Sequence, residues 1–443
     1  MTECNTSFEL FHPGKKKVVV DFSGGDLSSD GGIALLGELE NKHGFVERFS
    51  SCISDPRDPS RIIHSQESLI QQRVFQICSG YEDANDSQVL RNDPILKIAC
   101  GKLPATDGAL GSQPTITRLE NRVARNDLKR VRNFFVDEFI VSLGKEPEEI
   151  ILDIDGYADE THGNQQLSFF HGFYGYHMYH PVFITHAPSG FPVLLQLRAG
   201  NSHSGKGVKA ILRWIFWRLR TAFPKARIIL RGDGGFSLPE IMNVCEKQGI
   251  EYVLGYSRNP VLERKNAFLL ESARVQFCRT GVKARLFDDV FYMAGSWKAP
   301  RKIIMKAEVM EQGSNQRFLV TNMDGDAQSI YDDVYVMRAE HSENRIKELK
   351  IDLKADRLSC TDFNANQYRL MLHQLSYLFL LTVRGYAATT ELCKARFSTI
   401  QKTLIKIAVR VKETSRRVFC QFSSCCPYQN LFRKIFANIN YAT

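Results

Sequence analysis

The residues best placed to do chemistry are three aspartates at the ends of short apolar segments. Asp153 and Asp155 lie two positions apart in the run 150–155, so in a strand both side chains point to the same face. Asp233 ends a second run, 227–231, and stands among glycines. Ligands of open α/β sheets bind beyond the carboxyl ends of the strands, and two carboxylates on one face repel unless a cation lies between them. The pattern indicates a site for Mg²⁺ or Mn²⁺. The alternative is that Asp233 begins a turn and that Asp153 or Asp155 caps a neighbouring group.

A third carboxylate is expected from a helix predicted over residues 334–353. Glu343 lies at the edge of the apolar face of this helix, from which its side chain can point toward the sheet. Glu340 and Glu348 are rivals for the same role. A surface helix held by salt bridges would show the same pattern.

Histidine and cysteine are the other metal-binding residue types. Zinc hydrolases use histidine clusters, but His177 and His180 lack the spacing that places two imidazoles on one helix face. The cysteines form no Cys-x-x-Cys pair, so structural zinc is not expected at Cys420, Cys425 and Cys426. The clustered histidines are His162, His171, His177, His180, His186 and His203.

The segments that must position these residues alternate between strands and helices. Strands are predicted at 150–155, 191–199, 227–231 and 252–256, and helices at 209–223 and 237–249. This order predicts an α/β layered domain. A β-rich block over 258–326, with strands at 302–310 and 316–322, interrupts it before helices return at 334–353 and 363–383.

The N-terminal third mixes short apolar runs with polar loops. A helix is predicted at 33–39, after a polar start that contains Gly31-Gly32, but no Gly-Lys-Ser/Thr of a phosphate loop follows these glycines. A basic amphipathic helix is predicted over 117–139, with Arg122, Arg125 and Lys129 on its polar face. Such a helix can lie along a DNA backbone, although a solvated surface helix has the same pattern.

The net charge of +9 is concentrated at the C-terminal end of the chain. Residues 394–443 contain ten Lys or Arg and one acid, Glu413, so the rest of the chain is neutral overall. A basic segment of this kind favours a polyanionic partner, with nucleic acid as the first candidate. A solvated basic face that serves solubility is the alternative.

Length and composition restrict the class of protein. A chain of 443 residues has room for two or three domains with sizeable cores. The purest apolar run, Leu375–Val383, is much shorter than the roughly 20 residues of a membrane helix. The N-terminus has no basic segment followed by an apolar one, and the number of cysteines is odd. We therefore expect a cytoplasmic protein with reduced thiols and no membrane contact.

The motifs taken together resemble the group 1 Asp-Asp-Glu (DDE) transposases of bacterial insertion sequences, specifically the thirteen-eighty insertion-sequence family. The resemblance covers almost the whole chain. The motifs that carry it are Ser28–Gly32, Asp55–Pro59, Gly80–Asp86, Leu152–Asp155, Thr161–Gly163, Phe169–Gly172, Ile229–Phe236, Glu343–Lys350 and Pro427–Phe432.

The resemblance implies a ribonuclease-H-like fold with a β-rich insertion between the second Asp and the Glu. It also implies a catalytic and metal-binding triad of Asp155, Asp233 and Glu343, with Asp153 as a rival for the first position. The Tyr, Arg, Glu, Lys signature of the larger superfamily falls on Tyr335, Arg338, Glu343 and Lys350, of which Tyr335, Arg338 and Lys350 would contact DNA. Four residues separate Arg338 from Glu343 where the signature has three, and one extra residue turns a helix by about 100°.

The function implied by the resemblance is that of a DNA transposase. Such an enzyme binds terminal inverted repeats and catalyses strand cleavage and strand transfer into target double-stranded DNA with two Mg²⁺ (or Mn²⁺) ions. A homodimer on paired ends is expected. The alternatives are a metal-dependent nuclease of the same fold, an inactive copy that binds DNA as an inhibitor, and a zinc hydrolase.

The predicted domain organisation follows from these assignments. Residues 1–145 form a mainly helical region that binds the ends of the element, and residues 146–257 and 327–385 form the catalytic core. Residues 258–326 form the β-rich insertion, and residues 386–443 form a basic C-terminal region.

Overall fold

The computed structural model describes residues 7–10, 14–202, 205 and 207–441, without the side chains of 339–341. It divides into two compact units. Unit 1 contains residues 1–122 and 375–443, and unit 2 contains residues 123–374. The basic C-terminal segment therefore belongs to the same compact unit as the N-terminal segment. The finer domain boundaries expected from the sequence stay predictions.

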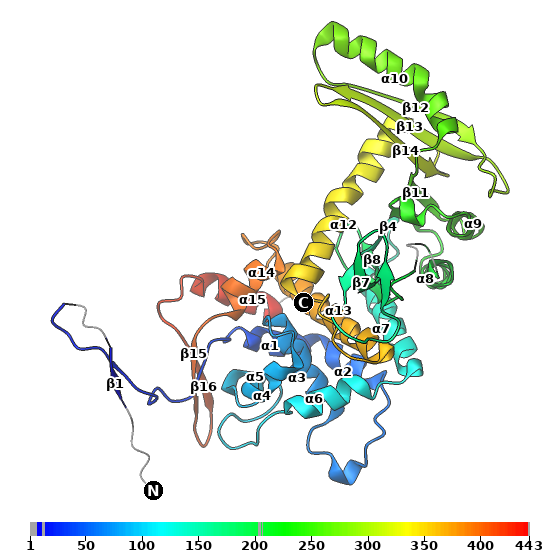
Figure 1. Cartoon of the computed structure of the whole chain (residues 1–443). Helices are drawn as coiled ribbons and strands as arrows, with labels where there is room; N and C mark the ends of the chain where they lie inside the picture. Colours follow the sequence, from blue (N-terminus) through cyan, green and yellow to red (C-terminus); the bar gives the residue numbers. More distant parts are fainter. Residues whose placement is uncertain (1–6, 11–13, 203–204, 206, 442–443) are drawn as a thin grey trace. The chain divides into compact units, whose positions relative to one another are not determined.

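Unit 2 is built on a mixed sheet with the strand order β12-β13-β14-β11-β10-β4-β8-β9 (Figure 1). β4, β10 and β11 run parallel, whereas β8 is antiparallel to both β4 and β9. Helix α8 (Val208–Ala222) connects β9 to β10, and α9 (Pro239–Lys247) connects β10 to β11. The central strands are β4 (Glu149–Gly156), β8 (Val182–His186), β9 (Pro192–Gln196), β10 (Arg227–Gly232) and β11 (Glu251–Tyr256). This mixed α/β sheet is consistent with the ribonuclease-H-like fold.

The central strands are apolar because the sheet interior is shielded from water. β4 and β10 pair in register, with Ile150 opposite Ile228 and Leu152 opposite Leu230, and all four side chains are buried. Parallel strands of this kind read as nearly continuous apolar runs, since helices cover them. The strands predicted at 150–155 and 227–231 therefore match β4 and β10 to within one residue at each end, whereas the strand predicted at 191–199 is longer than β9 and β8 was not predicted.

The block predicted as β-rich contains a long helix as well as strands. Helix α10 (Pro260–Thr280) comes first and is followed by the meander β12 (Ala284–Tyr292), β13 (Arg301–Met310) and β14 (Gly313–Thr321), on which it packs (Figure 1). β14 pairs antiparallel with β11, so the meander extends the central sheet. The helix was missed because few of its side chains are buried, and its apolar periodicity is correspondingly weak.

The segment after the meander is helical but not regular. A short helix α11 (Ala327–Ser329) is followed by a π-helical segment η4 (Ile330–Val336), by α12 (Met337–Lys347) and by a second π-helical segment η5 (Glu348–Asp352). Ile330 and Tyr331 in η4 pack into the apolar cluster on the sheet. π-Helical turns are rare and occur often at functional sites.

Unit 1 contains short helices and a small sheet in which the two ends of the chain combine. β3 (Leu27–Ser28) pairs with β15 (Val409–Glu413), which pairs with β16 (Val418–Phe422). The helices and π-helical segments are α1 (Ile33–His43), α2 (Phe45–Ser51), α3 (Gln66–Cys78), α4 (Ser87–Leu90), α5 (Pro94–Ala99), α6 (Gln113–Asn121), α14 (Phe397–Ile400), η6 (Gln401–Ile405) and α15 (Gln429–Tyr441). The basic C-terminal segment is therefore folded into a core, while all ten of its Lys and Arg residues are exposed.

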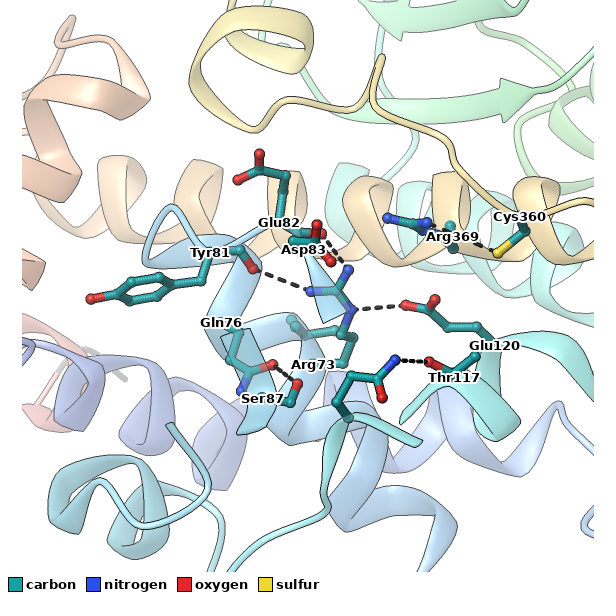
Figure 2. A network of polar contacts seen from close by, with 12 residues as sticks. Arg73, Gln76, Tyr81, Glu82, Asp83, Ser87, Thr117, Glu120, Cys360 and Arg369 are labelled. Carbon is teal, nitrogen blue, oxygen red and sulfur yellow. Dashed lines mark hydrogen bonds and ion pairs between the residues drawn. The ribbon is translucent and has the colours of Figure 1, made fainter. Parts of the chain in front are cut away.

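The interior of unit 1 contains a buried ion pair (Figure 2). Arg73 Nε on α3 lies 2.8 Å from Glu120 Oε1 on α6, and both side chains are almost fully buried. The other guanidinium nitrogens donate to the backbone carbonyl oxygens of Tyr81 and Glu82. The Gly80–Asp86 motif thus supplies acceptors that satisfy a buried cation, which is a structural role.

The Ser28–Gly32 motif also has a structural role. Asp30 is buried and accepts a hydrogen bond from the Tyr81 hydroxyl (2.8 Å), and its other oxygen pairs with Lys406 Nζ (2.6 Å). At Gly32 an added Cβ would lie 1.8 Å from the carbonyl oxygen of Leu404. These glycines allow close packing of two chain segments, in agreement with the absence of a phosphate-loop motif.

The basic helix predicted over 117–139 is two helices. α6 ends at Asn121 and α7 (Arg125–Leu143) begins anew, with the Asp127 carboxylate accepting a hydrogen bond from the backbone N–H of Ala124 (2.9 Å). This cap satisfies an N–H that a continuous helix would have bonded internally. Among the described residues, no helix is long and apolar enough to cross a membrane, and Leu375–Val383 lies within α13 (Phe363–Tyr386).

Candidate active site

The pairing of two parallel strands brings two of the predicted carboxylates together. Arg231 on β10 is opposite Asp153 on β4, and Gly232 is opposite Ile154. The same register, continued by one residue, places Asp233 beside Asp155. Their backbones are then separated by one strand spacing, about 4.8 Å. The two carboxylates interact electrostatically, because Asp233 contributes to the raised pKa of Asp155.

Asp155 is held by two side chains of α12. Arg338 Nη2 and Ser342 Oγ each donate to Asp155 Oδ2 at 2.9 Å, and the backbone N–H of Gly156 donates to Oδ1. Burial raises the pKa of Asp155, Arg338 lowers it and Asp233 raises it further. The net rise means that the ionised carboxylate is incompletely compensated by the protein. Ser342 was missed from the sequence, although it is the residue reached when three residues separate the Arg from the acid, as in the superfamily signature.

Asp153, the rival for the first position, belongs to a buried ion pair instead. Arg231 Nε lies 2.6 Å from Asp153 Oδ1 and Nη2 lies 2.8 Å from Oδ2, with both side chains almost fully buried. Arg231 Nη1 also donates to the carbonyl oxygen of Val334, which ties η4 to the sheet. Both oxygens of Asp153 are thus committed to a structural contact.

The structure does not bring Glu343 to the aspartate pair. Its side chain is 69% exposed and pairs with Lys347 Nζ at 2.8 Å, one turn along α12. This hydrogen bond lowers the pKa of Glu343. Of the rival acids, Glu348 is buried and lies 3.7 Å from Arg345 Nη1, whereas the side chain of Glu340 lies outside the described residues. Ser342 occupies the side of α12 that faces Asp155.

Asp233 lies at one end of a cleft of about 440 Å³. Its Oδ1 accepts a hydrogen bond from the backbone N–H of Gly235 (2.9 Å). The backbone approaches closely here, because a Cβ on Gly255 would lie 2.9 Å from the nitrogen of Gly234 and 3.0 Å from the hydroxyl of Tyr335. Tyr335, Arg258 and Arg317 also line this cleft, and the contact of Tyr335 with DNA stays a prediction.

Arg338 and Lys350, the other predicted DNA-contacting residues of this helical segment, are both engaged with protein groups. Arg338 binds Asp155, as described above. Lys350 Nζ donates to the carbonyl oxygen of Ala158 (2.8 Å) and lies 3.6 Å from Asp356 Oδ2. Their contact with DNA stays a prediction.

Two histidines of the predicted cluster lie close to the aspartates. The imidazoles of His171 and His180 are 5.8 Å apart, and the Tyr174 ring contacts both. Asp155 and Asp233 both act on the pKa of Tyr174, which burial raises. Among the described residues, no group of three or more His, Cys, Asp or Glu side chains has the arrangement of a metal site, and His203 lies outside them. The proximity of Tyr174 had no counterpart in any sequence motif.

The predicted DNA-binding residues of the basic helix separate at the break between α6 and α7. Arg122 donates to Gln66 Oε1 (2.8 Å) and lies 3.8 Å from Asp55 Oδ1, within unit 1. Arg125 and Lys129 are exposed on α7 and line a second cleft in unit 2. Whether the three residues bind DNA stays a prediction.

The donor set fits one hard cation rather than two. Asp155 and Asp233 supply carboxylate oxygens on adjacent strands, and their mutual repulsion, which raises the pKa of Asp155, would be relieved by a cation between them. Mg²⁺ is often held by one or two carboxylates with water completing the octahedron. A second ion needs a further ligand, which Glu343 does not supply in this conformation.

Similarity to known proteins identifies the family of the chain. A search of curated proteins finds no match. Among solved structures, the chain is similar to a piggyBac transposase synaptic complex with hairpin DNA, determined by cryo-EM, at 12% identity and a TM-score of 0.44, over 84% of this chain and 79% of that chain. Residues 12–443 match the family described as Transposase DDE domain group 1. The chain therefore belongs to the group 1 family of DDE transposases.

Proposed function

We propose that this protein is a DNA transposase that binds the terminal inverted repeats of an insertion sequence and catalyses metal-dependent strand cleavage and strand transfer. The observation that carries the proposal is the convergence of Asp155 and Asp233 at the carboxyl ends of adjacent parallel strands. Two carboxylates at this position suit phosphoryl transfer, in which charge neutralisation and positioning supply most of the catalysis.

In this proposal Asp155 and Asp233 hold the divalent cation. When bound, that cation lowers the pKa of water and neutralises charge on the scissile phosphate. The glycines around Asp233 let a DNA strand approach the backbone closely, and Arg258 and Arg317 line the cleft that a phosphate would enter. Their guanidinium groups would position the strand by contacts to its phosphates.

We assign the third carboxylate to Glu343, reached by a turn of α12. Moving Glu343 into the place of Ser342 is a shift of one residue, or about 100° about the helix axis. π-Helical segments lie on both sides of α12, and each π turn holds one residue more than an α turn. Transfer of one residue from one π segment to the other would turn α12 without changing the length of the whole segment.

A second function is favoured by one specific contact. The guanidinium of Arg338 bonds to Oδ2 of Asp155, an oxygen that a cation would need as a ligand, and Glu343 faces solvent. A chain fixed in this conformation would bind DNA without cleaving it and would act as an inhibitor of active copies.

Cleavage of duplex DNA carrying the terminal repeat, measured with Mg²⁺ and with Mn²⁺, distinguishes the two functions. A transposase loses cleavage in Asp233→Asn while it keeps DNA binding, and a strand-transfer assay separates it from a nuclease that never joins ends. Glu343→Gln should abolish cleavage and Ser342→Ala should not. If wild-type protein binds the repeat but cleaves it with neither ion, the transposase proposal fails and the inhibitor stands.

The exchange of two neighbouring residues tests the assignment of Glu343 directly. The double variant Ser342→Glu/Glu343→Ser places a carboxylate on the side of α12 that already faces Asp155. We expect it to bind Mn²⁺ more tightly than the wild type, because no turn of the helix is then needed. Weaker Mn²⁺ binding by this variant would contradict the proposed register.

A further inference from the structure

A basic cleft of about 490 Å³ lies in unit 2, beyond the carboxyl end of the edge strand β9. Four cationic side chains line it, together with apolar residues, and no Asp or Glu occurs among the described residues of its lining. Three of the cations lie on α7 at spacings of four and three residues, which places them on one face of the helix. The cations are Arg125, Lys129, Arg132 and Arg198.

Two of these cations are held in place by the protein. The Arg132 guanidinium lies over the Trp214 ring of α8 at 4.4 Å, and burial lowers its pKa. Arg198 is buried, its Nε donates to the carbonyl oxygen of His180 (2.9 Å), and burial lowers its pKa to about 10. Both guanidinium groups therefore contribute fixed positive charge to the lining of the cleft, which attracts an anion.

The cleft and the aspartate pair lie at the same edge of the sheet. β9 and β4 point in the same direction, because each is antiparallel to β8. Gln196, which lines the cleft, is opposite Val182, and Val182 is opposite Gly156, the residue after Asp155. Two strand spacings, about 10 Å, therefore separate the cleft from the strand of Asp155, and three, about 14 Å, separate it from that of Asp233.

His180 joins the two regions. Its backbone N–H donates to the carbonyl oxygen of Arg198 (3.1 Å), and its Nδ1 lies 2.9 Å from the carbonyl oxygen of Ser202. The other ring nitrogen, Nε2, packs against Gly156, where an added Cβ would lie only 3.0 Å away. His180 thus connects two residues of the cleft lining, Arg198 and Ser202, to Gly156, the residue after Asp155.

We propose that this cleft binds the sugar-phosphate backbone of the duplex whose scissile phosphate lies at Asp155 and Asp233. The inference rests on the proposed function and adds the path of the DNA. Duplex DNA rises 3.4 Å per nucleotide along each strand. Because phosphates of one strand lie at least this far apart, a distance of about 10 to 14 Å places the contacts within about four nucleotides of the cleaved bond.

The first test uses two neighbouring residues of α7. Lys129 lines the cleft, whereas Arg130 is outside its lining and pairs with Asp127. Binding of a 30-base-pair duplex is measured by fluorescence anisotropy from 50 to 200 mM salt for Lys129→Ala, Arg130→Ala and Arg125→Ala/Lys129→Ala.

Each phosphate contact contributes about 0.9 to the slope of log affinity against log salt. Over this fourfold salt range the affinity loss of Lys129→Ala should therefore be about threefold smaller than that of the wild type, and that of the double variant about tenfold smaller. Arg130→Ala should keep the wild-type slope. Equal slopes for Lys129→Ala and Arg130→Ala would overturn the assignment of the cleft.

The second test locates the contact on the DNA. Single phosphates of the terminal-repeat duplex are replaced by uncharged methylphosphonates at each of the first eight positions from the cleavage site. We expect a loss of wild-type affinity at one or more of the positions within about four nucleotides of the cleavage site, and no further loss at those positions in Arg125→Ala/Lys129→Ala. Cleavage with no such phosphate dependence would overturn the cleft and leave the transposase proposal standing. If the protein does not cleave DNA but Lys129→Ala still has a smaller salt slope than Arg130→Ala, the proposed chemistry is refuted and DNA binding by the cleft is supported.

Discussion

Two aspartates on one strand, two residues apart, should respond in opposite ways to the same substitution. Asp153 neutralises the buried Arg231 through both of its oxygens. Asp155 instead accepts hydrogen bonds from Arg338 and Ser342 and is repelled by Asp233. Asp153→Asn should therefore lower the free energy of unfolding of unit 2 without abolishing cation binding or DNA cleavage. Asp155→Asn should leave the fold intact and abolish cation binding and cleavage.

The magnitudes follow from burial. Loss of one partner from a buried ion pair leaves the other charge uncompensated and costs about 3–5 kcal/mol. For a unit of this size that corresponds to a fall in melting temperature on the order of 10 °C. At Asp155 the asparagine oxygen can still accept from Arg338 or Ser342, and the repulsion from Asp233 is removed, so the change in unfolding free energy should stay below about 1 kcal/mol.

Thermal unfolding with and without Mn²⁺, followed by a cleavage assay on the folded protein, separates these effects. Wild-type and Asp153→Asn proteins should both be stabilised by Mn²⁺, and Asp155→Asn should not. The double variant Asp153→Leu/Arg231→Met is the control, because replacement of both members of a buried pair by apolar residues is often close to neutral. The reasoning is refuted if Asp153→Asn melts like the wild type and loses cleavage while Asp155→Asn still cleaves.

Three further predictions concern unit 1. Burial raises the pKa of Glu40 to about 7, so the stability that this shift contributes is full below the ordinary pKa of glutamate and is lost as the pH rises through 7. The loss is at most about 3 kcal/mol. Glu40→Gln should remove this pH dependence, as measured by urea unfolding at pH 5 and pH 8. Gly32→Ala should destabilise unit 1 in thermal unfolding, because the new Cβ would lie 1.8 Å from a carbonyl oxygen, and unchanged stability would refute that packing. Deletion of residues 394–443 removes β15 and buried side chains and should abolish the circular dichroism signal of a folded unit 1. Arg417 is exposed, so Arg417→Ala should keep the fold. If the basic segment contacts a phosphate through Arg417, this variant should lower the slope of log DNA affinity against log salt by about 0.9.

Most of the α/β core could be predicted from the sequence because its strands are short, apolar and bounded by glycine or charge. The strands predicted at 150–155, 227–231 and 252–256 correspond to β4, β10 and β11. The helix α10 was missed, because it packs on the meander through few residues and offers little periodicity. The prediction of a single basic helix over 117–139 was wrong. The Asp127 carboxylate caps the start of α7 at Ala124, so the chain forms two helices although the amphipathic pattern is continuous.

Local sequence features were enough to find the aspartates of the candidate site. They were not enough to choose between Asp153 and Asp155. Asp153 and Asp155 have the same strand face and nearly the same neighbours in sequence. Only the pairing of β4 with β10 shows that Arg231 reaches Asp153 and that Asp155 is left beside Asp233. The helix acids present the same problem, because only the structure shows that Ser342, and not Glu343, contacts Asp155.

The sequence by itself determined the family, the alternating strands and helices and the two carboxylates at strand ends, because these depend on residue type and on spacing over a few positions. The tertiary structure decided which carboxylate is neutralised, which side of α12 faces Asp155 and that the two chain ends share one core. Those features depend on register between segments far apart in the chain. A shift of one residue there exchanges a buried side chain for an exposed one without changing the local pattern.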